Sequence, residues 1–249
     1  MNRLLELVCP AGTPAALRGA IDAGADTVYL GFRDETNARN FPGLNFNRDE
    51  LQDGIKYAHD RGRQIFVAIN TFPRAGNPEA WHQAVDDAAR LKADAVILAG
   101  VGLLQYCADK HPDLRRHLSV QASASNPDAI NFFQREFDIR RIVLPRVLTV
   151  AEIATLNSTI TVETEVFAFG GLCVMAEGRC ALSSYATGQS PNLCGVCSPA
   201  SHVRYEETED GLKSRLGDFT INMFDEDEPV GYPTLCKGRF VADGSASYL

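Results

Sequence analysis

The chain of 249 residues lacks any hydrophobic run that approaches the ~18 apolar residues of a membrane-spanning helix. Its amino-terminal segment, residues 1–12, is too short to hold the apolar core of a signal peptide. The chain also lacks an excess of basic residues, and its net charge of −8 disfavours nucleic acid as a partner, because phosphate binding depends mainly on lysine and arginine. We therefore expect a cytoplasmic protein without a membrane span.

Several catalytic and cofactor-binding motifs are missing as well. No G-x-G-x-x-G turn follows a predicted strand, which argues against a dinucleotide-binding sheet. There is no H-E-x-x-H, no G-x-S-x-G and no evident cysteine–histidine pair, so the sequence shows none of the familiar peptidase signatures. Two C-x-x-C knuckles at zinc-ribbon spacing and a ferredoxin-type cysteine run are also absent.

What the chain does contain is a regular alternation of short β-branched runs with helical segments. Hydrophobic residues make up 45% of the chain, enough for one large core. Three helix starts carry capping signals: Thr13 before Pro14, Asn47 with Glu50, and Thr149 with Glu152. The predicted strands cover residues 4–8, 27–32, 64–70, 95–100, 118–123, 141–146 and 162–170.

Strict alternation of strands and helices with short turns predicts a parallel sheet. The number of units favours a (β/α)8 TIM-like barrel, which needs eight units and about 250 residues. Only seven strands can be found, so we expect the chain to end before the eighth unit. The alternative is an open, doubly wound sheet.

The alternation of predicted strands and helices stops after residue 170, and this change divides the chain into two parts. We expect residues 1–170 to form the first seven barrel units. Residues 171–249 are rich in cysteine and then hairpin-like, and they are too many for an ordinary βα loop of ~2–6 residues. They predict a cysteine-rich insertion after the seventh strand, with the last barrel unit beyond residue 249.

Four cysteines of the insertion, Cys173, Cys180, Cys197 and Cys236, lie among glycine, proline and basic residues that predict turns. Turn-borne thiolates gathered at one place usually hold a soft metal. Their irregular spacing favours an iron–sulfur cluster bound by loops, while structural zinc and simple reduced thiols stay open as alternatives. Cys194 is an additional thiol beside the third cysteine, and the spacing does not exclude it as a ligand.

Polar side chains follow the predicted strands at the end where barrel enzymes carry their active sites. Amides and arginines suit an oxygen-rich anionic ligand, because arginine can grip a carboxylate with two hydrogen bonds. The alternative is that they cap helices and satisfy loop carbonyls. These candidate substrate-binding residues are Asn37, Arg39, Asn70, Gln121, Arg146 and Glu165, and no catalytic residue can be chosen among them.

Ordered motifs along nearly the whole chain carry a resemblance to a known family. They include CPAG at 9–12, TNARNFPGLNF at 36–46, SVQASASN at 119–126, EVFAFGGLCVMAEGRC at 165–180 and YPTLCKGR at 232–239. The sequence resembles the collagenase-like peptidases, peptidase family U32. The resemblance implies a [4Fe–4S] cluster whose four cysteine ligands map onto Cys173, Cys180, Cys197 and Cys236.

The similarity is greatest to short members of the family that act in ubiquinone biosynthesis. It implies an iron–sulfur subunit of an O2-independent hydroxylase that uses prephenate as oxygen source and a ubiquinone precursor as acceptor. It also implies a heterodimer with a homologous UbiV-like protein, and little activity for the chain alone. Prephenate-dependent hydroxylation of tRNA or ribosomal RNA, and a U32-type peptidase, are the alternatives.

Overall fold

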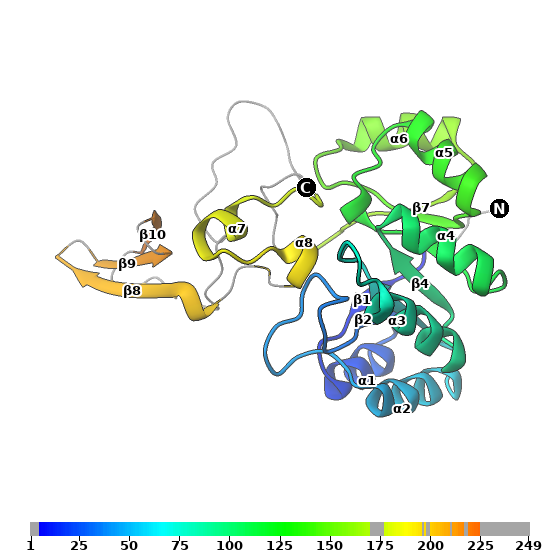
Figure 1. The fold of residues 1–249 in the computed structure, drawn as a ribbon, viewed down its shortest axis with the longest axis horizontal. Coiled ribbons are helices and arrows are strands. Elements are labelled where there is room, and N and C mark those ends of the chain that lie inside the picture. The colour runs from blue at the N-terminus through cyan, green and yellow to red at the C-terminus, as the bar shows by residue number, and fades with distance from the viewer. Residues whose placement is uncertain are drawn as a thin grey trace.

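The structure is a computed structural model that describes residues 5–169, 177–195, 197, 200–209, 211–216 and 219–224. Seven parallel strands form one sheet in the order of the chain, from β1 to β7. The sheet curls into an open barrel with helices outside it (Figure 1). The strands are β1 Val8–Pro10, β2 Thr27–Gly31, β3 Gln64–Ile69, β4 Ala95–Leu98, β5 Arg116–Leu118, β6 Arg141–Val143 and β7 Glu163–Glu165. The predicted TIM-like alternation is thus confirmed for seven strands.

Three helices between the strands begin at the caps that the sequence predicts. Thr13 accepts a hydrogen bond from the backbone of the first turn, and Asn47 and Thr149 both complete capping boxes. A capping residue satisfies backbone N–H groups that have no partner within the helix. The helices are α1 Pro14–Asp22, α2 Arg48–His59, α3 Glu79–Arg90, α4 Val101–Lys110, α5 Pro127–Phe137 and α6 Val150–Thr159.

Several predicted strand boundaries were wrong. The run 118–123 is not a strand, because β5 ends at Leu118 and Val120–Ala122 forms a 3-10 turn capped by the Ser119 side chain. Ser123 then adopts a left-handed conformation, with φ of 52°. The first strand also begins later than predicted, and the sixth and seventh strands are only three residues long. The hydrophobic runs of the fifth, sixth and seventh strands continue beyond the carboxyl ends of these strands into the following loops.

Two hydrophobic clusters lie on the two faces of the sheet. The larger one fills the space between strands and helices, and Trp81 is its largest fully buried side chain. The smaller one lies inside the curled sheet and includes Phe66, Ile97 and Val143, with Tyr29 packed against it. Period-two alternation along each strand separates these two sets. Polar side chains therefore share the interior with only a small apolar cluster.

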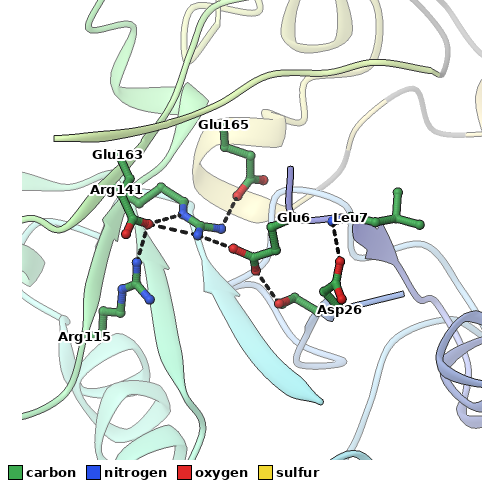
Figure 2. A network of polar contacts seen from close by, with 8 residues as sticks. Glu6, Leu7, Asp26, Arg115, Arg141, Glu163 and Glu165 are labelled. Atoms are coloured by element: carbon green, nitrogen blue, oxygen red, sulfur yellow. Dashed lines mark hydrogen bonds and ion pairs between the residues drawn. The ribbon is translucent and has the colours of Figure 1, made fainter. Parts of the chain in front are cut away.

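Arg141 of β6 is the centre of a charged network inside the barrel (Figure 2). It bonds Glu163 at 2.9 Å and Glu165 at 3.3 Å on β7, and Glu6 just before β1. Arg115 adds a second guanidinium on Glu163 at 2.5 Å. Because the Arg141 side chain is only 8% exposed, three carboxylates from both edges of the sheet converge on one largely buried cation.

The pKa values of two carboxyl groups in this network are shifted in opposite directions. Burial alone would raise the pKa of Glu6, but its hydrogen bonds with Arg141 and Thr27 outweigh it and lower that pKa. Burial raises the pKa of Glu165, and Arg141 opposes this only in part. A carboxyl whose charged form is poorly solvated holds its proton to higher pH. Glu165 is therefore the member of this pair that takes up a proton more easily.

His117 of β5 lies in the same interior, edge-on to Phe66 with ring centroids 4.5 Å apart. Burial, together with the charges of Arg141 and Arg115, lowers the pKa of His117 to about 2. The imidazole is consequently neutral at physiological pH. Within the described residues neither ring nitrogen has a hydrogen-bond partner.

A separate antiparallel sheet follows the barrel in the order β10-β9-β8. Its strands are β8 Val203–Thr208, β9 Gly211–Leu216 and β10 Phe219–Phe224, which confirms the predicted hairpin-like region. Two short helices, α7 Leu182–Thr187 and α8 Pro191–Cys194, lie between this sheet and the barrel (Figure 1). No helix within the described ranges is long and apolar enough to cross a membrane.

Replacement of Arg141 by methionine should lower the free energy of unfolding by about 3 kcal/mol, because it leaves carboxylates in the barrel interior without their cation. This value is at the low end for a broken buried pair, since the Glu6 and Glu163 side chains are 30% and 37% exposed. Urea unfolding of the two proteins measures the difference. Arg135→Met is the control, because the Arg135 side chain is 68% exposed. Equal stability of the two variants would contradict the role of Arg141.

Candidate functional site at the barrel mouth

The mouth of the barrel, where the carboxyl ends of the strands meet, is covered by a long loop after β2. Asn37 and Asn45 are both buried in this loop, and the Asn37 amide donates to the Asn45 carbonyl oxygen at 2.9 Å. The same two side chains hold the backbone of Arg39. Its N–H donates to Asn37 Oδ1 at 3.0 Å, and its carbonyl accepts from Asn45 Nδ2 at 2.9 Å. Arg39 is therefore presented from a fixed backbone.

Asn70 joins this loop to the end of β3. Its side-chain oxygen accepts a hydrogen bond from the backbone N–H of Ala38 at 2.9 Å, and its own N–H donates to the Thr36 carbonyl at 3.0 Å. Thr71, the next residue, donates through its hydroxyl to the Glu35 carbonyl. Asn70 is buried, and its side-chain oxygen and backbone N–H position the Arg39 loop.

Residues 177–195 and 197, which we call the cysteine segment, are docked onto the mouth. The first contact lies on the loops after β5 and β6. Gln121 accepts from the Gly178 N–H at 2.8 Å, and Glu177 Oε1 accepts from both the backbone N–H of Arg146, at 3.1 Å, and its side-chain Nε, at 3.0 Å. The Ser123 hydroxyl donates to the Glu177 carbonyl. The Arg146 and Glu177 side chains are 10% and 3% exposed, so this ion pair is almost completely shielded from solvent.

A second contact lies on the loops after β2 and β3. The Gly195 carbonyl accepts from the Asn40 N–H at 3.0 Å, and the Asn192 carbonyl accepts from the Phe72 N–H at 2.8 Å. A Cβ added to Gly195 would lie 2.4 Å from the Asn37 carbonyl oxygen, which no side chain tolerates. Glycine is therefore required for this close approach.

Two of the four predicted cluster cysteines can be located. Cys180 follows the first contact by two residues and Cys197 follows the second by two residues, and both are half-buried. Cys173 and Cys236 lie outside the described residues. The two cysteines follow contacts on different parts of the rim, and the described residues hold no group of three or more His, Cys, Asp and Glu side chains that could bind a metal. The four-cysteine cluster therefore stays a prediction. Cys194 differs, because it ends α8.

The mouth uses most of the predicted ligand-binding side chains to hold its own loops. The alternative reading of Asn37, Asn70 and Gln121, that they satisfy loop backbone, describes their contacts in the structure. Arg146 pairs with Glu177 through its backbone N–H and Nε, and its guanidinium lies over the Phe167 ring at 5.0 Å. Of the six candidates, Arg39 and Glu165 are not used in this way.

Tyr29 was missed by the sequence analysis. It lies on β2, packs against the apolar cluster inside the barrel, and is affected by the charges of Arg39, Glu165 and Arg146. Burial raises the pKa of its phenol, which therefore stays neutral. The alternation of TVYLG along β2 was the available signal, since it places Tyr29 and Gly31 on one face and two aliphatic residues on the other.

A cavity of about 340 Å3 opens at the opposite end of the barrel, at the amino ends of β5 to β7. Its two arginines, Arg115 and Arg140, are paired with Glu163 and Asp138. Barrel enzymes place their chemistry at the carboxyl ends of the strands. We therefore assign the functional site to the mouth and not to this cavity.

The chain belongs to peptidase family U32, whose model matches residues 12–233. A relative described as an uncharacterised protease of Methanocaldococcus jannaschii is 35% identical over 97% of this chain and 55% of its own length. tRNA hydroxylation protein P of Escherichia coli is 33% identical over 90% of this chain and 48% of its own length. The chain thus spans about half the length of these curated relatives.

A solved structure described as the U32 peptidase Mk0906 matches this fold with a TM-score of 0.56. The match covers 67% of this chain and 69% of that one, at 19% identity. This similarity supports the curled parallel sheet with its helices.

Gly178→Ala should release the first contact of the cysteine segment. Gly178 has φ of +68°, and a Cβ there would lie 2.1 Å from the Gln121 carbonyl oxygen. Gly188→Ala is a matched control, because Gly188 has φ of +72° but no atom within 4 Å of the added Cβ. Amide hydrogen exchange across residues 177–187 should accelerate at least about tenfold more in Gly178→Ala, as expected for a lost docking contact. Equal acceleration in both variants would contradict the docking.

Proposed function

We propose that this chain is the barrel module of an O2-independent hydroxylase that carries a [4Fe–4S] cluster over its mouth and acts on tRNA. The observation that carries the proposal is the attachment of the cysteine segment to the rim at two independent contacts, through Gly178 and Gly195. That arrangement directs the two locatable cysteines toward the end of the barrel where such folds carry out their chemistry.

The name of one relative supports hydroxylation as the reaction and tRNA as the substrate. tRNA hydroxylation protein P shares 33% identity across 90% of this chain. The whole protein's substrate stays a proposal, because the chain spans about half of that relative.

Charge at the rim is compatible with an anionic substrate in spite of the overall charge of −8. Arg39 in the β2 loop and Arg179 in the cysteine segment form no ion pair with any described residue. Arginines without internal partners can contact phosphate or carboxylate groups. The sequence expectation against nucleic acid rested on net charge alone, which does not describe this local surface.

Cys173, Cys180, Cys197 and Cys236 would hold the cluster, with each thiolate bound to one iron. When bound, such a cluster supplies electron transfer or a Lewis-acidic iron next to the mouth. The protein's own residues would fix the loops, through the Arg146–Glu177 pair and the asparagines of the β2 loop, and would bind the oxygen donor. The predicted donor is prephenate, which carries two carboxylates.

The second candidate is hydroxylation of a ubiquinone precursor by a UbiU-like subunit together with a UbiV-like partner. The sequence motifs favour it, in particular YPTLCKGR at 232–239, a region outside the described residues. The acidic balance of the chain is also compatible with a substrate other than RNA.

Anaerobically prepared full-length protein should contain about four irons per chain, one for each thiolate of a four-cysteine cluster. Cys→Ala substitution at 173, 180, 197 or 236 should remove most of that iron, as determined by iron and sulfide analysis. Cys194→Ala is the matched control and should keep its iron, because this thiol lies at the end of helix α8 and not on a turn. Iron lost from Cys194→Ala but kept by Cys197→Ala would reverse the assignment of the third ligand.

The substrate is tested in anaerobically grown cells that lack their own tRNA-hydroxylating and quinone-hydroxylating proteins. Expression of the full-length protein should restore hydroxylated nucleosides in tRNA, measured by mass spectrometry, and the product should disappear when prephenate synthesis is blocked. Recovery of ubiquinone without the tRNA product would favour the second candidate. Cleavage of gelatin by metal-free protein, with neither product, would favour a peptidase.

A further inference from the structure

An exposed apolar run follows β7 directly at the barrel mouth. Residues 166–169, with the sequence VFAF, are all exposed. Val166 and Phe167 are 48% and 39% exposed, and Phe169 is fully exposed, at 101%. Single exposed apolar residues are common on protein surfaces, but several in a row beside a candidate site indicate a contact surface.

Phe167 has a fixed place in this run because Arg146 lies against it. The guanidinium carbon of Arg146 is 5.0 Å from the centroid of the Phe167 ring, which is a cation–π contact. Arg146 is itself held by Glu177, through its Nε at 3.0 Å and its backbone N–H at 3.1 Å. Because the largely buried guanidinium covers one part of the ring, the exposed surface of Phe167 lies elsewhere on the ring and is open to another planar group.

Arg179 belongs to the same side of the mouth. The residue before it, Gly178, donates its N–H to Gln121 Oε1 at 2.8 Å. The residue before that, Glu177, holds Arg146 at 3.0 Å. The backbone that leads into Arg179 is therefore anchored at two points, the second of which is in contact with the apolar run. Arg179 is exposed, and within the described ranges it forms no ion pair, so its charge is available to a ligand.

The loops on this side of the mouth carry a net positive charge, although the chain as a whole has a net charge of −8. They are residues 119–126 after β5, 144–149 after β6 and 166–169 after β7, together with the docked segment 177–195. The charged residues in these loops are Arg146, Glu177 and Arg179. Because Arg146 and Glu177 neutralise each other, the charge of Arg179 stays uncompensated there, which favours an anionic partner.

Exposed aromatic rings and an uncompensated guanidinium on one rim match a single-stranded nucleic acid. Unpaired bases stack on aromatic side chains, and arginine binds the phosphates that join them. A base inside a duplex offers no free face, so the matching part of a tRNA is an unpaired loop. We propose that Phe167, Phe169 and Arg179 form the contact surface for an unpaired segment of tRNA, with bases stacked on the two rings and a phosphate on Arg179. This surface rests on the proposed function and supplies its substrate contacts.

Fluorescence anisotropy of a labelled, unmodified tRNA transcript tests the surface in anaerobically prepared full-length protein. Phe169→Ala should weaken binding about 5- to 100-fold, the range for the loss of one stacked base. Phe169→Leu keeps apolar area but has no aromatic face, so it should weaken binding at least about fivefold. Phe169→Trp offers a larger aromatic face and should bind at least as tightly as the parent protein.

Phe132→Leu is the matched control for the aromatic residues. Phe132 is 41% exposed and has Arg135 over its ring at 5.8 Å, but it lies on α5, outside the barrel (Figure 1). This variant should bind tRNA as the parent protein does. Arg179→Gln should lower the slope of log affinity against log salt concentration by about 0.7 to 0.9, the value for one lost phosphate contact, and Arg135→Gln should leave the slope unchanged.

Phe169→Leu that binds tRNA as tightly as Phe132→Leu would overturn the surface, because an apolar contact with a quinone precursor or with a protein would survive that change. An unchanged salt slope in Arg179→Gln would overturn it as well. Hydroxylated nucleosides, measured with the same proteins, separate this inference from the proposed function. Parent protein that hydroxylates tRNA while every variant binds normally would reject the surface and leave the function intact. Parent protein that neither binds nor hydroxylates tRNA would reject the function, and the surface with it.

Discussion

The ion cluster around Arg141 is the constraint on which the rest of the barrel depends. Its guanidinium reaches Glu6 at one edge of the seven-stranded sheet and Glu163 and Glu165 at the other, so that the charges connect the two edges across the interior (Figure 2). A buried arginine without these partners would be strongly unfavourable. The network therefore ties the segment before β1 to β7 across the curled sheet, with Arg141 as the shared partner.

Most polar residues at the barrel mouth hold its loops in place, while Arg39 is available to bind a ligand. Asparagines and Gln121 hold loops, and the dry Arg146–Glu177 pair holds the cysteine segment. Because these side chains have hydrogen-bond partners within the protein, they hold the loops of the mouth in fixed positions before any ligand binds. Arg39, by contrast, is fixed at its backbone and left open at its guanidinium, which is the arrangement expected of a preorganised binding residue.

Much of the architecture could be predicted from local patterns. The caps at Thr13, Asn47 and Thr149, and the β-branched runs between them, were sufficient for seven strands in order. The run 118–123 was misread because Ser119 caps a 3-10 turn, and a serine in an apolar run does not reveal which structure it favours. Pairings between distant residues were beyond the sequence. Nothing local indicates that Arg146 meets Glu177, 31 positions away, or that Arg141 meets Glu6. The glutamates at alternate positions of β7 were a visible sign of a polar interior.

We infer that the barrel mouth, with its docked cysteine segment, is the reaction site. An experimental structure of anaerobically prepared full-length protein with prephenate tests it most directly. We expect a four-iron cluster bound by Cys180 and Cys197 together with Cys173 and Cys236, and a carboxylate of the ligand on Arg39. A cluster bound elsewhere, or a ligand seated in the cavity at the amino ends of β5 to β7, would contradict it.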